Sequence, residues 1–417
     1  MQHGLDLAVV AALAGSLALW SLVAERFARW NVTAPMVFVA VGWMLSENRL
    51  GAIHVSIGGD GVREIAEIAL AVVLFGDAAG INLTELGRDR ALPSRLLVIG
   101  LPITIAAGAL AAKLVFPDLS WWICALIGAA VAPTDAALSA GIIEDTRVPE
   151  RVRTVLNVES GLNDGIATPF VNFFLVAAVA GTAFDDGTRA GALVDLGAGT
   201  LIGLAIGAAG GWLSALARQR GWALVHQREI GVAALSVLAY AITVEAGANG
   251  FVAAVVAGLG YAATAGRERS VSLDFTHDTA NVLSLVVWFL FGAVMLPVLA
   301  DADWRHVLFA ALALTIVRMA PVAIALIGAK CDPATVAVFG WFGPRGLASV
   351  VFALLAFGEL APADGGPVLT AITMTVVLSV VLHGVSAAPV ARRYALYAGD
   401  RADVAGGGEP RRRNGNG

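Results

Sequence analysis

Apolar runs of about 20 residues recur from one end of this 417-residue chain to the other. A run of that length is what an α-helix needs to cross the hydrocarbon core of a bilayer. The composition agrees, because 58% of the residues are hydrophobic and only 14% are charged, whereas globular proteins carry about a quarter charged residues. The sequence therefore predicts an all-α polytopic membrane protein rather than several soluble domains.

Thirteen candidate spans can be counted, centred near residues 15, 40, 70, 104, 131, 170, 203, 236, 257, 287, 315, 345 and 378. An odd number of spans puts the two ends on opposite faces, and the positive-inside rule tests this. With a cytoplasmic C-terminus, most of the 27 basic residues fall in inner loops or the tail. The outer side receives only Arg49, Arg63, Lys113, Arg189 and Arg305. The charges thus favour an outer N-terminus and a cytoplasmic C-terminus. The composition, rich in alanine, glycine and arginine, favours the inner membrane of a bacterium.

Two spans contain helix-breaking residues at their centres. The fifth has Pro133, and the twelfth has Gly343, Pro344 and Gly346. Proline removes a backbone hydrogen bond. Such a break is tolerated in lipid only where other groups hydrogen-bond to the freed backbone. If spans 1 to 6 and 8 to 13 are two inverted halves, the breaks fall at the fifth helix of each. Matched broken helices indicate a transporter with its site at their crossing.

Charged residues accompany both breaks. Asp135 follows Pro133 near the start of the second half-helix, where exposed N–H groups favour an anion. Arg345 directly follows Pro344. We expect these two side chains to balance the partial charges of the facing half-helices, which is a structural role.

The stretch "VESGLNDG" places two carboxylates, a hydroxyl and an amide inside the sixth span. At about 100° per residue, Glu159, Ser160, Asn163 and Asp164 lie on one face of the helix. Ionisable groups at membrane depth are costly and usually mark an ion or proton pathway. A polar seam that joins helices is the simpler reading, but it rarely needs two acids.

Arg318 in the eleventh span is an available partner for one of the two acids. Pairing it with Glu159 leaves Asp164 uncommitted, able to hold a proton or a small cation but not both. Sodium prefers oxygen ligands, which Asp164, Ser160 and carbonyl groups near Thr134 could provide. The sequence shows no zinc motif, nucleotide-binding loop or nucleic-acid surface, so we expect no cofactor and no nucleic-acid partner.

The segment "APTDAALSAGIIEDTRVPERVRTVLNVESGLNDG" resembles the fifth and sixth helices of the cation:proton antiporter 1 family, the NhaP-type sodium/proton antiporters. "LFGDAAGINL", "VRMAP" and "GWFGPRGLASV" resemble further family blocks, in the expected order. One departure is that Pro133 precedes Thr134 here, where many members have Thr-Asp-Pro. The resemblance implies a homodimer in the membrane that exchanges monovalent cations for protons.

The resemblance also implies roles for individual residues. Asp164 would carry the cation and the proton in turn, and Asn163 would mark the electroneutral branch of the family. The remaining implied assignments are cation ligation by Thr134 and Ser160, a companion role in the crossover for Asp135, pairing of Glu159 with Arg318, and an acidic position near the cytoplasmic funnel for Asp77.

The same resemblance divides the chain into a moving core and an interface part. Helices 1 to 3 (1–90) and the linker helix 7 with helices 8 to 10 (184–300) would form the interface. Helices 4 to 6 (91–183) and 11 to 13 (301–397) would form the core. Residues 398–417 are expected to be a short disordered cytoplasmic tail.

Three other functions remain open on sequence grounds. A cation channel would need repeated filter sequences or acidic rings. A sodium-coupled importer of a small organic anion would need basic groups at the crossover, where only Arg345 offers itself. An intramembrane hydrolase would use Asp135 and Asp164 as an acid/base pair, but it would leave the pairing of Glu159 with Arg318 unexplained.

Overall fold

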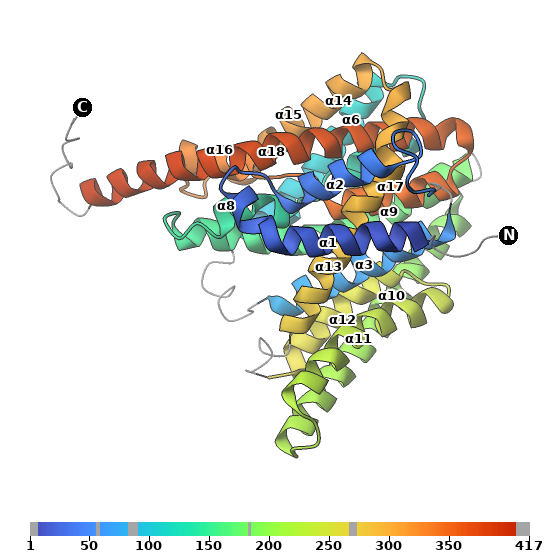
Figure 1. Ribbon diagram of the computed structural model, residues 1–417, viewed down its shortest axis with the longest axis vertical. Helices are drawn as coiled ribbons and strands as arrows, with labels where there is room; N and C mark the ends of the chain where they lie inside the picture. The colour runs from blue at the N-terminus through green and yellow to red at the C-terminus, as the bar shows by residue number, and fades with distance from the viewer. Residues whose placement is uncertain (1–6, 56–58, 82–90, 182–184, 267–272, 406–417) are drawn as a thin grey trace.

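The computed structural model describes residues 7–55, 59–81, 91–181, 185–266 and 273–405 (Figure 1). Within these ranges the secondary structure is helical, and no strand is present. Eight helical segments of this part are long and apolar enough to cross a membrane, and four shorter apolar helices accompany them. The all-α membrane fold predicted from the sequence is therefore confirmed.

The helices follow the thirteen predicted spans in order. Those of the first seven spans are α1 (Leu7–Ala28), α2 (Ala34–Leu45), α3 (Asp60–Gly80), α5–η1–α6 (Ala91–Arg95, Leu96–Gly100, Leu101–Val115), α7–η2–α8 (Trp121–Ala130, Ala137–Ser139, Ala140–Ile143), α9 (Glu150–Ala180) and α10 (Asp186–Gln219). Those of the last six are α11 (Val225–Glu245), α12 (Gly250–Thr264), α13–η4–η5 (Asp274–Leu290, Phe291–Met295, Leu296–Asp301), α14–α15 (Trp304–Leu314, Ile316–Ala325), α16–α17 (Pro333–Trp341, Leu347–Glu359) and α18 (Pro362–Ala405).

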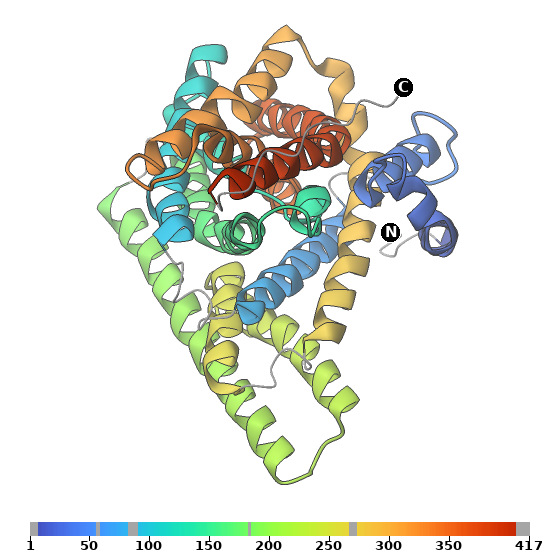
Figure 2. The same ribbon diagram turned by 90° about the vertical axis from the view of Figure 1, so that its left-hand side faces the viewer.

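Small residues allow helix backbones to approach closely in one part of the molecule. Gly199, Gly203, Gly207 and Gly211 recur every fourth residue along α10, and a Cβ at any of them would overlap the backbone of the α12 region. Such small-residue faces drive helix packing in lipid, where the hydrophobic effect between helices is absent. Figure 2 shows α10 and α11 extending away from the rest of the molecule, with α18 central in the opposite part.

The two predicted helix breaks are present and cross each other. α7 ends at Ala130 and helical structure resumes at Ala137, whereas α16 ends at Trp341 and α17 begins at Leu347. The two irregular segments are joined by a backbone hydrogen bond, because the Asp135 N–H donates to the Pro344 carbonyl at 2.8 Å. Side chains cap the first half-helices at the ends that lie away from the crossing: Ser120 caps α7, and Asp332 caps α16. The crossing places four half-helix ends at one point in the molecule.

The C-terminal helix is longer than the sequence analysis expected. α18 runs from Pro362 to Ala405, so residues 398–405, assigned to a disordered tail, are helical. The reason is that no proline follows Pro389 until Pro410, and alanine-rich sequence continues through this stretch. Residues 406–417, the rest of the expected tail, lie outside the described residues.

Candidate functional site

The carboxylate of Asp135 lies between the starts of two half-helices. Its Oδ1 accepts a hydrogen bond from the Ala137 N–H at 2.7 Å, and its Oδ2 accepts one from the Leu347 N–H at 3.2 Å. Unsatisfied N–H groups make a helix N-terminus partly positive. One acid therefore compensates both the second half of span 5 and the second half of span 12.

Arg345 compensates the opposite partial charge. Its side chain is fully buried, and its guanidinium donates to the carbonyl oxygens of Ala132 at 3.0 Å, Pro133 at 3.4 Å and Ala313 at 3.2 Å. These carbonyl groups lie at or just beyond the C-terminal ends of α7 and α14, where helices are partly negative. The sequence placed both charges at the breaks. The structure shows that Asp135 bonds to the backbone of both breaks, whereas the guanidinium of Arg345 bonds to the break of span 5 and to the end of α14.

Two glycines of the second break make room for these charged side chains. A Cβ at Gly346 would overlap the carboxylate of Asp135. A Cβ at Gly343 would overlap the guanidinium of Arg318. A side chain at either position would therefore displace a charged group that the crossing needs.

Glu159 and Arg318 form a buried ion pair. Glu159 Oε1 lies 2.6 Å from an Arg318 guanidinium nitrogen, and each side chain is only 3% exposed. The guanidinium also donates to the Phe339 carbonyl at 3.3 Å. Such a pair gains little net free energy over an apolar one, but removing one partner leaves an isolated buried charge. The pair therefore ties α9 to α15, and the bond to the Phe339 carbonyl ties α15 to α16.

Three polar side chains connect the first break to α9. The Asn163 amide Nδ2 donates to Thr134 Oγ1, which lies 3.2 Å from Ser160 Oγ. All three residues are buried, and the Asn163 Oδ1 has no hydrogen-bond partner among the described residues. The hydroxyl groups of Thr134 and Ser160 therefore lie together. Asp164, the acid that follows Asn163 in α9, lines the same cavity as both.

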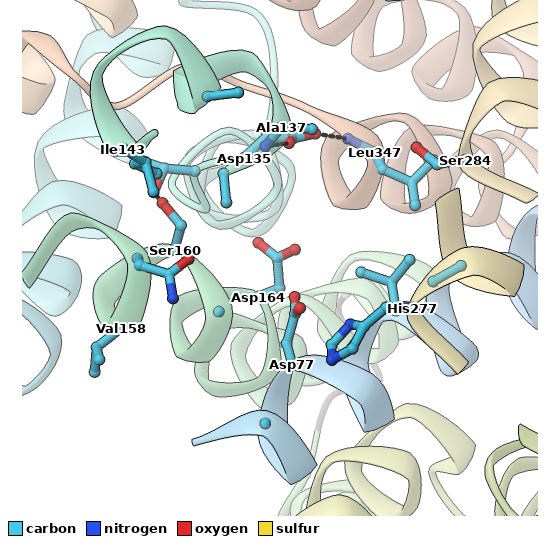
Figure 3. Close-up of a pocket in the computed structure, with 18 of the residues that line it drawn as sticks. Asp77, Asp135, Ala137, Ile143, Val158, Ser160, Asp164, His277, Ser284 and Leu347 are labelled. Atoms are coloured by element: carbon cyan, nitrogen blue, oxygen red, sulfur yellow. Dashed lines mark hydrogen bonds between the residues drawn. The ribbon is translucent and has the colours of Figure 1, made fainter. Parts of the chain in front are cut away.

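Asp164 lies at the deep end of a cavity of about 620 Å³. Thr134, Asp135, Ser160 and Asp77 also line this cavity, and Figure 3 shows Asp77 and Asp164 facing the same space. No hydrogen bond or ion pair reaches the carboxylate of Asp164 from another described residue; only its backbone carbonyl is used, by Thr168. The structure thus brings Asp164, Ser160, Thr134, Asp135 and Asp77 to one cavity and keeps Glu159 and Arg318 out of it.

The cavity extends from Asp164 toward one face of the membrane. Its lining reaches Ile81 after α3, Glu144 after α8, Thr154 near the start of α9 and His277 near the start of α13. Ile81 and Glu144 follow the ends of their helices, whereas Thr154 and His277 lie near the starts of theirs, so the cavity runs toward one end of these four helices.

The opposite path from Asp164 is blocked by packed side chains. A Cβ at Gly165 would overlap the side chain of Val255 from α12, so α9 and α12 touch directly beyond the acid. Farther along, a separate cavity of about 470 Å³ is lined by Val171, Phe352 and Arg63. At its rim Arg63 of α3 pairs with Glu359 of α17 at 3.1 Å and with Glu67 at 2.7 Å. The site is therefore open toward one face and closed toward the other.

Sequence reasoning missed one residue of the crossover. His383 of α18 is fully buried; its Nε2 lies 3.0 Å from the Trp341 carbonyl and its Nδ1 3.2 Å from Ser379 Oγ. Ser379 Oγ in turn accepts the Arg345 N–H at 2.6 Å. His383 therefore holds the end of α16 and, through Ser379, the backbone of the break. The i, i+4 spacing of Ser379 and His383 was the available signal, but nothing in the sequence pointed from α18 to the break.

Crossed broken helices in a bundle of membrane-spanning helices, with an acid at the crossing that no described residue pairs, define a secondary transporter of the inverted-repeat class. Comparison with known proteins identifies the family. Residues 11–393 match the sequence model described as "Sodium/hydrogen exchanger, transmembrane". The chain belongs to this family of multi-pass membrane transporters.

Relatives named as cation/proton antiporters are similar to this chain over most of its length. The chain is 28% identical over 386 residues to the K(+)/H(+) antiporter NhaP of Alkalimonas amylolytica, covering 91% of this chain and 65% of that protein. It is 29% identical over 357 residues to the Na(+)/H(+) antiporter NhaP of Pseudomonas aeruginosa, covering 79% of this chain and 80% of that protein. The chain thus spans less than two thirds of the length of the Alkalimonas relative. The solved structure of the sodium proton antiporter MjNhaP1 from Methanocaldococcus jannaschii shares the fold, with a TM-score of 0.72 at 21% identity, covering 90% of this chain and 98% of that one.

Proposed function

We propose that the protein is a secondary antiporter that exchanges protons for a monovalent cation, Na⁺, Li⁺ or K⁺. The observation that carries the proposal is the cavity that ends at Asp164, beside the hydroxyl groups of Ser160 and Thr134. Among the described residues, this acid has no counter-ion. A carboxylate and two hydroxyl groups are the oxygen ligands that hard cations prefer. The relatives named as K(+)/H(+) and Na(+)/H(+) antiporters support the same activity.

The chemistry at Asp164 is competition between two cargoes. The ionised carboxylate binds the dehydrated cation together with Ser160 and Thr134, whereas the protonated carboxyl binds none. Asn163 donates to Thr134 and so holds that hydroxyl group beside Ser160. The exchange uses the transported ions themselves and needs no bound cofactor.

The exchange is one cation for one proton and is electroneutral. Asn163 carries an amide that cannot release a second proton at the site. Asp135 is engaged by two backbone N–H groups, and Glu159 is held by Arg318. Asp164 therefore remains as the acid at the crossing that cycles between a loaded and a protonated form. Initial rates that depend steeply on an imposed membrane potential would contradict this stoichiometry.

Alternating access follows from movement of one helix group past the other. Helices of 91–183 and 301–397 form the moving core with Asp164, and helices of 1–90 and 184–300 form the interface scaffold of a homodimer in the plasma membrane. The N-terminus lies outside and the C-terminus in the cytoplasm, so the Asp164 cavity opens inward in this conformation. The pair of Arg63 with Glu359 joins scaffold helix α3 to core helix α17 on the closed outer side. Moving the core outward breaks that contact and opens the outer path to Asp164.

An importer of an organic anion fits the cavity less well. Arg345, the basic group at the crossover, is buried and bonded to three carbonyl groups. The cavity is lined by Asp77, Asp135, Glu144 and Asp164, and its only basic lining residue within the described ranges is His277. Such a lining attracts cations and repels carboxylates.

Reconstituted protein tests the proposed activity. Proteoliposomes with an imposed pH gradient are given NaCl, LiCl, KCl or choline chloride, and the internal pH is followed. We expect at least one of the three metal cations to collapse the gradient, with no effect of choline. If no cation collapses the gradient unless an organic anion is added, the antiporter assignment is wrong.

A further inference from the structure

The face of α9 that borders the Asp164 cavity carries a row of neutral oxygen-bearing side chains. Thr154, Asn157 and Ser160 precede Asp164 along the helix, and all four line the cavity. At about 100° per residue they lie within about 120° of one another around the helix, and at 1.5 Å per residue the row is about 15 Å long. Thr154 and Asn157 are exposed, although α9 is a membrane-crossing helix.

A second polar row on α13 borders the same cavity. His277, Asn281 and Ser284 line it at spacings that put all three on one helix face. Figure 3 shows His277 and Ser284 on the α13 side of the space that Asp164 and Asp135 face. Asn281 lies between them on the helix and is exposed. Neither the Asn157 nor the Asn281 side chain is hydrogen-bonded to another described residue.

The row on α9 leads past Asp77 to the cation site. A Cβ at Gly161 would lie 3.5 Å from the Cβ of Asp77, so Asp77 approaches α9 about one turn before Asp164. A cation on this path must give up its water molecules before Asp164 binds it. Neutral oxygens can replace water without holding the ion as strongly as a carboxylate would, and a conducting path needs sites that release as readily as they bind.

We propose that Thr154 and Asn157 of α9, with Asn281 of α13 on the lining of the same cavity, form the dehydration path through which the cation reaches Asp164 and set the apparent affinity for it. The inference rests on the proposed antiport and adds residues that touch the ion before the exchange site does. Because α13 belongs to the scaffold and α9 to the core, the path exists only when the two groups are aligned as they are here.

The test uses inside-out membrane vesicles, in which the cavity faces the added salt, with NaCl and then KCl as the probes. The KM for the cation and the maximal rate are measured for wild type, Asn157→Leu, Asn281→Leu and the conservative Asn157→Ser. Thr279→Leu is the matched control, because Thr279 is on α13 but does not line the cavity. The loss of one oxygen ligand, about 1 kcal/mol, predicts a KM about fivefold higher for each leucine variant. We expect the maximal rate to stay within about twofold, Asn157→Ser to keep most of the wild-type affinity, and Thr279→Leu to match wild type.

The possible results separate the two proposals. Wild-type vesicles without cation-dependent proton movement overturn the antiporter assignment itself. Active variants whose KM equals that of wild type, or whose maximal rate falls at constant KM, overturn the proposed dehydration path. These results leave the antiporter assignment standing. If a leucine variant fails to fold, Asn157→Ser and Thr154→Val decide the matter. Thr154→Val preserves the size of the side chain and removes its oxygen, whereas Asn157→Ser shortens the side chain but keeps one oxygen.

Discussion

Glu159 and Asp164 are two acids on the same helix, about one and a half turns apart, yet they occupy opposite environments. Glu159 is sealed against Arg318 and is 3% exposed. Asp164 has no counter-ion among the described residues and ends a cavity of about 620 Å³. The comparison teaches that burial alone does not define an ion site, because a transporting acid must lack a fixed partner and be reachable from water.

Loss of the Asp164 carboxylate is the largest effect that this comparison predicts. We expect Asp164→Asn to reduce cation-dependent proton flux at least about a hundredfold, because an amide can neither bind a proton nor balance a cation. The protein should remain folded, since no described residue is hydrogen-bonded to this carboxylate. Proteoliposome flux and size-exclusion chromatography measure the two outcomes. Residual exchange near the wild-type rate would remove Asp164 from its central role.

Loss of Arg318 should act on stability instead. Arg318→Ala leaves Glu159 buried without its cation, which typically costs about 3–5 kcal/mol. We expect a clear drop in the melting temperature in detergent and in yield. The double variant Glu159→Gln with Arg318→Met removes both charges and should recover much of that loss. A fully stable Arg318→Ala protein would show that the pair has no structural role.

Asp135 should give an intermediate effect on transport. Asp135→Asn replaces one acceptor with an amide N–H₂ that meets the Ala137 or Leu347 N–H, and it removes the charge between two half-helix starts. An unmatched buried donor costs about 1–3 kcal/mol, so we expect the maximal rate to fall about tenfold. Asp145→Asn in the loop after α8 is the control, since Asp145 bonds to Arg147 outside the crossing. Equal rates in the two variants would argue against the role of Asp135.

The outer ion pair should have the smallest effect. Arg63 is 39% exposed and Glu359 is 48% exposed, so their pair is worth only about 0–1 kcal/mol. We expect Glu359→Gln to shift the balance toward the outward-facing state by about twofold. Accessibility to a thiol reagent of a cysteine introduced at Val171, beside the outer cavity, would rise accordingly. No change in labelling would mean that this contact does not bias the equilibrium.

Much of the fold could be predicted because long apolar runs identify membrane-spanning helices. The breaks at Pro133 and Pro344 could be predicted because proline interrupts the hydrogen bonds of a helix. The pairing of Glu159 with Arg318 could be anticipated from charge balance, since few cations lie within the spans. The sequence could not link His383 to the break, and it could not show that Asn157 and Asn281 line one cavity. Both relations depend on how helices that are distant in the sequence pack together. The spacing of residues along a single helix does not determine that packing. The helical end of α18 was missed because composition alone was taken as a sign of disorder.

Proton release on cation binding tests the central claim most directly, that Asp164 holds either a proton or a cation. Purified protein in weakly buffered detergent solution is given saturating NaCl or KCl, with choline chloride as the ionic-strength control, across a range of pH. Wild type should release up to one proton per chain, with apparent cation affinity weakening as pH falls, because protons compete for the same carboxylate. Asp164→Asn should release none, while Asp77→Asn should still release protons. Equal release from wild type and folded Asp164→Asn protein would contradict the account.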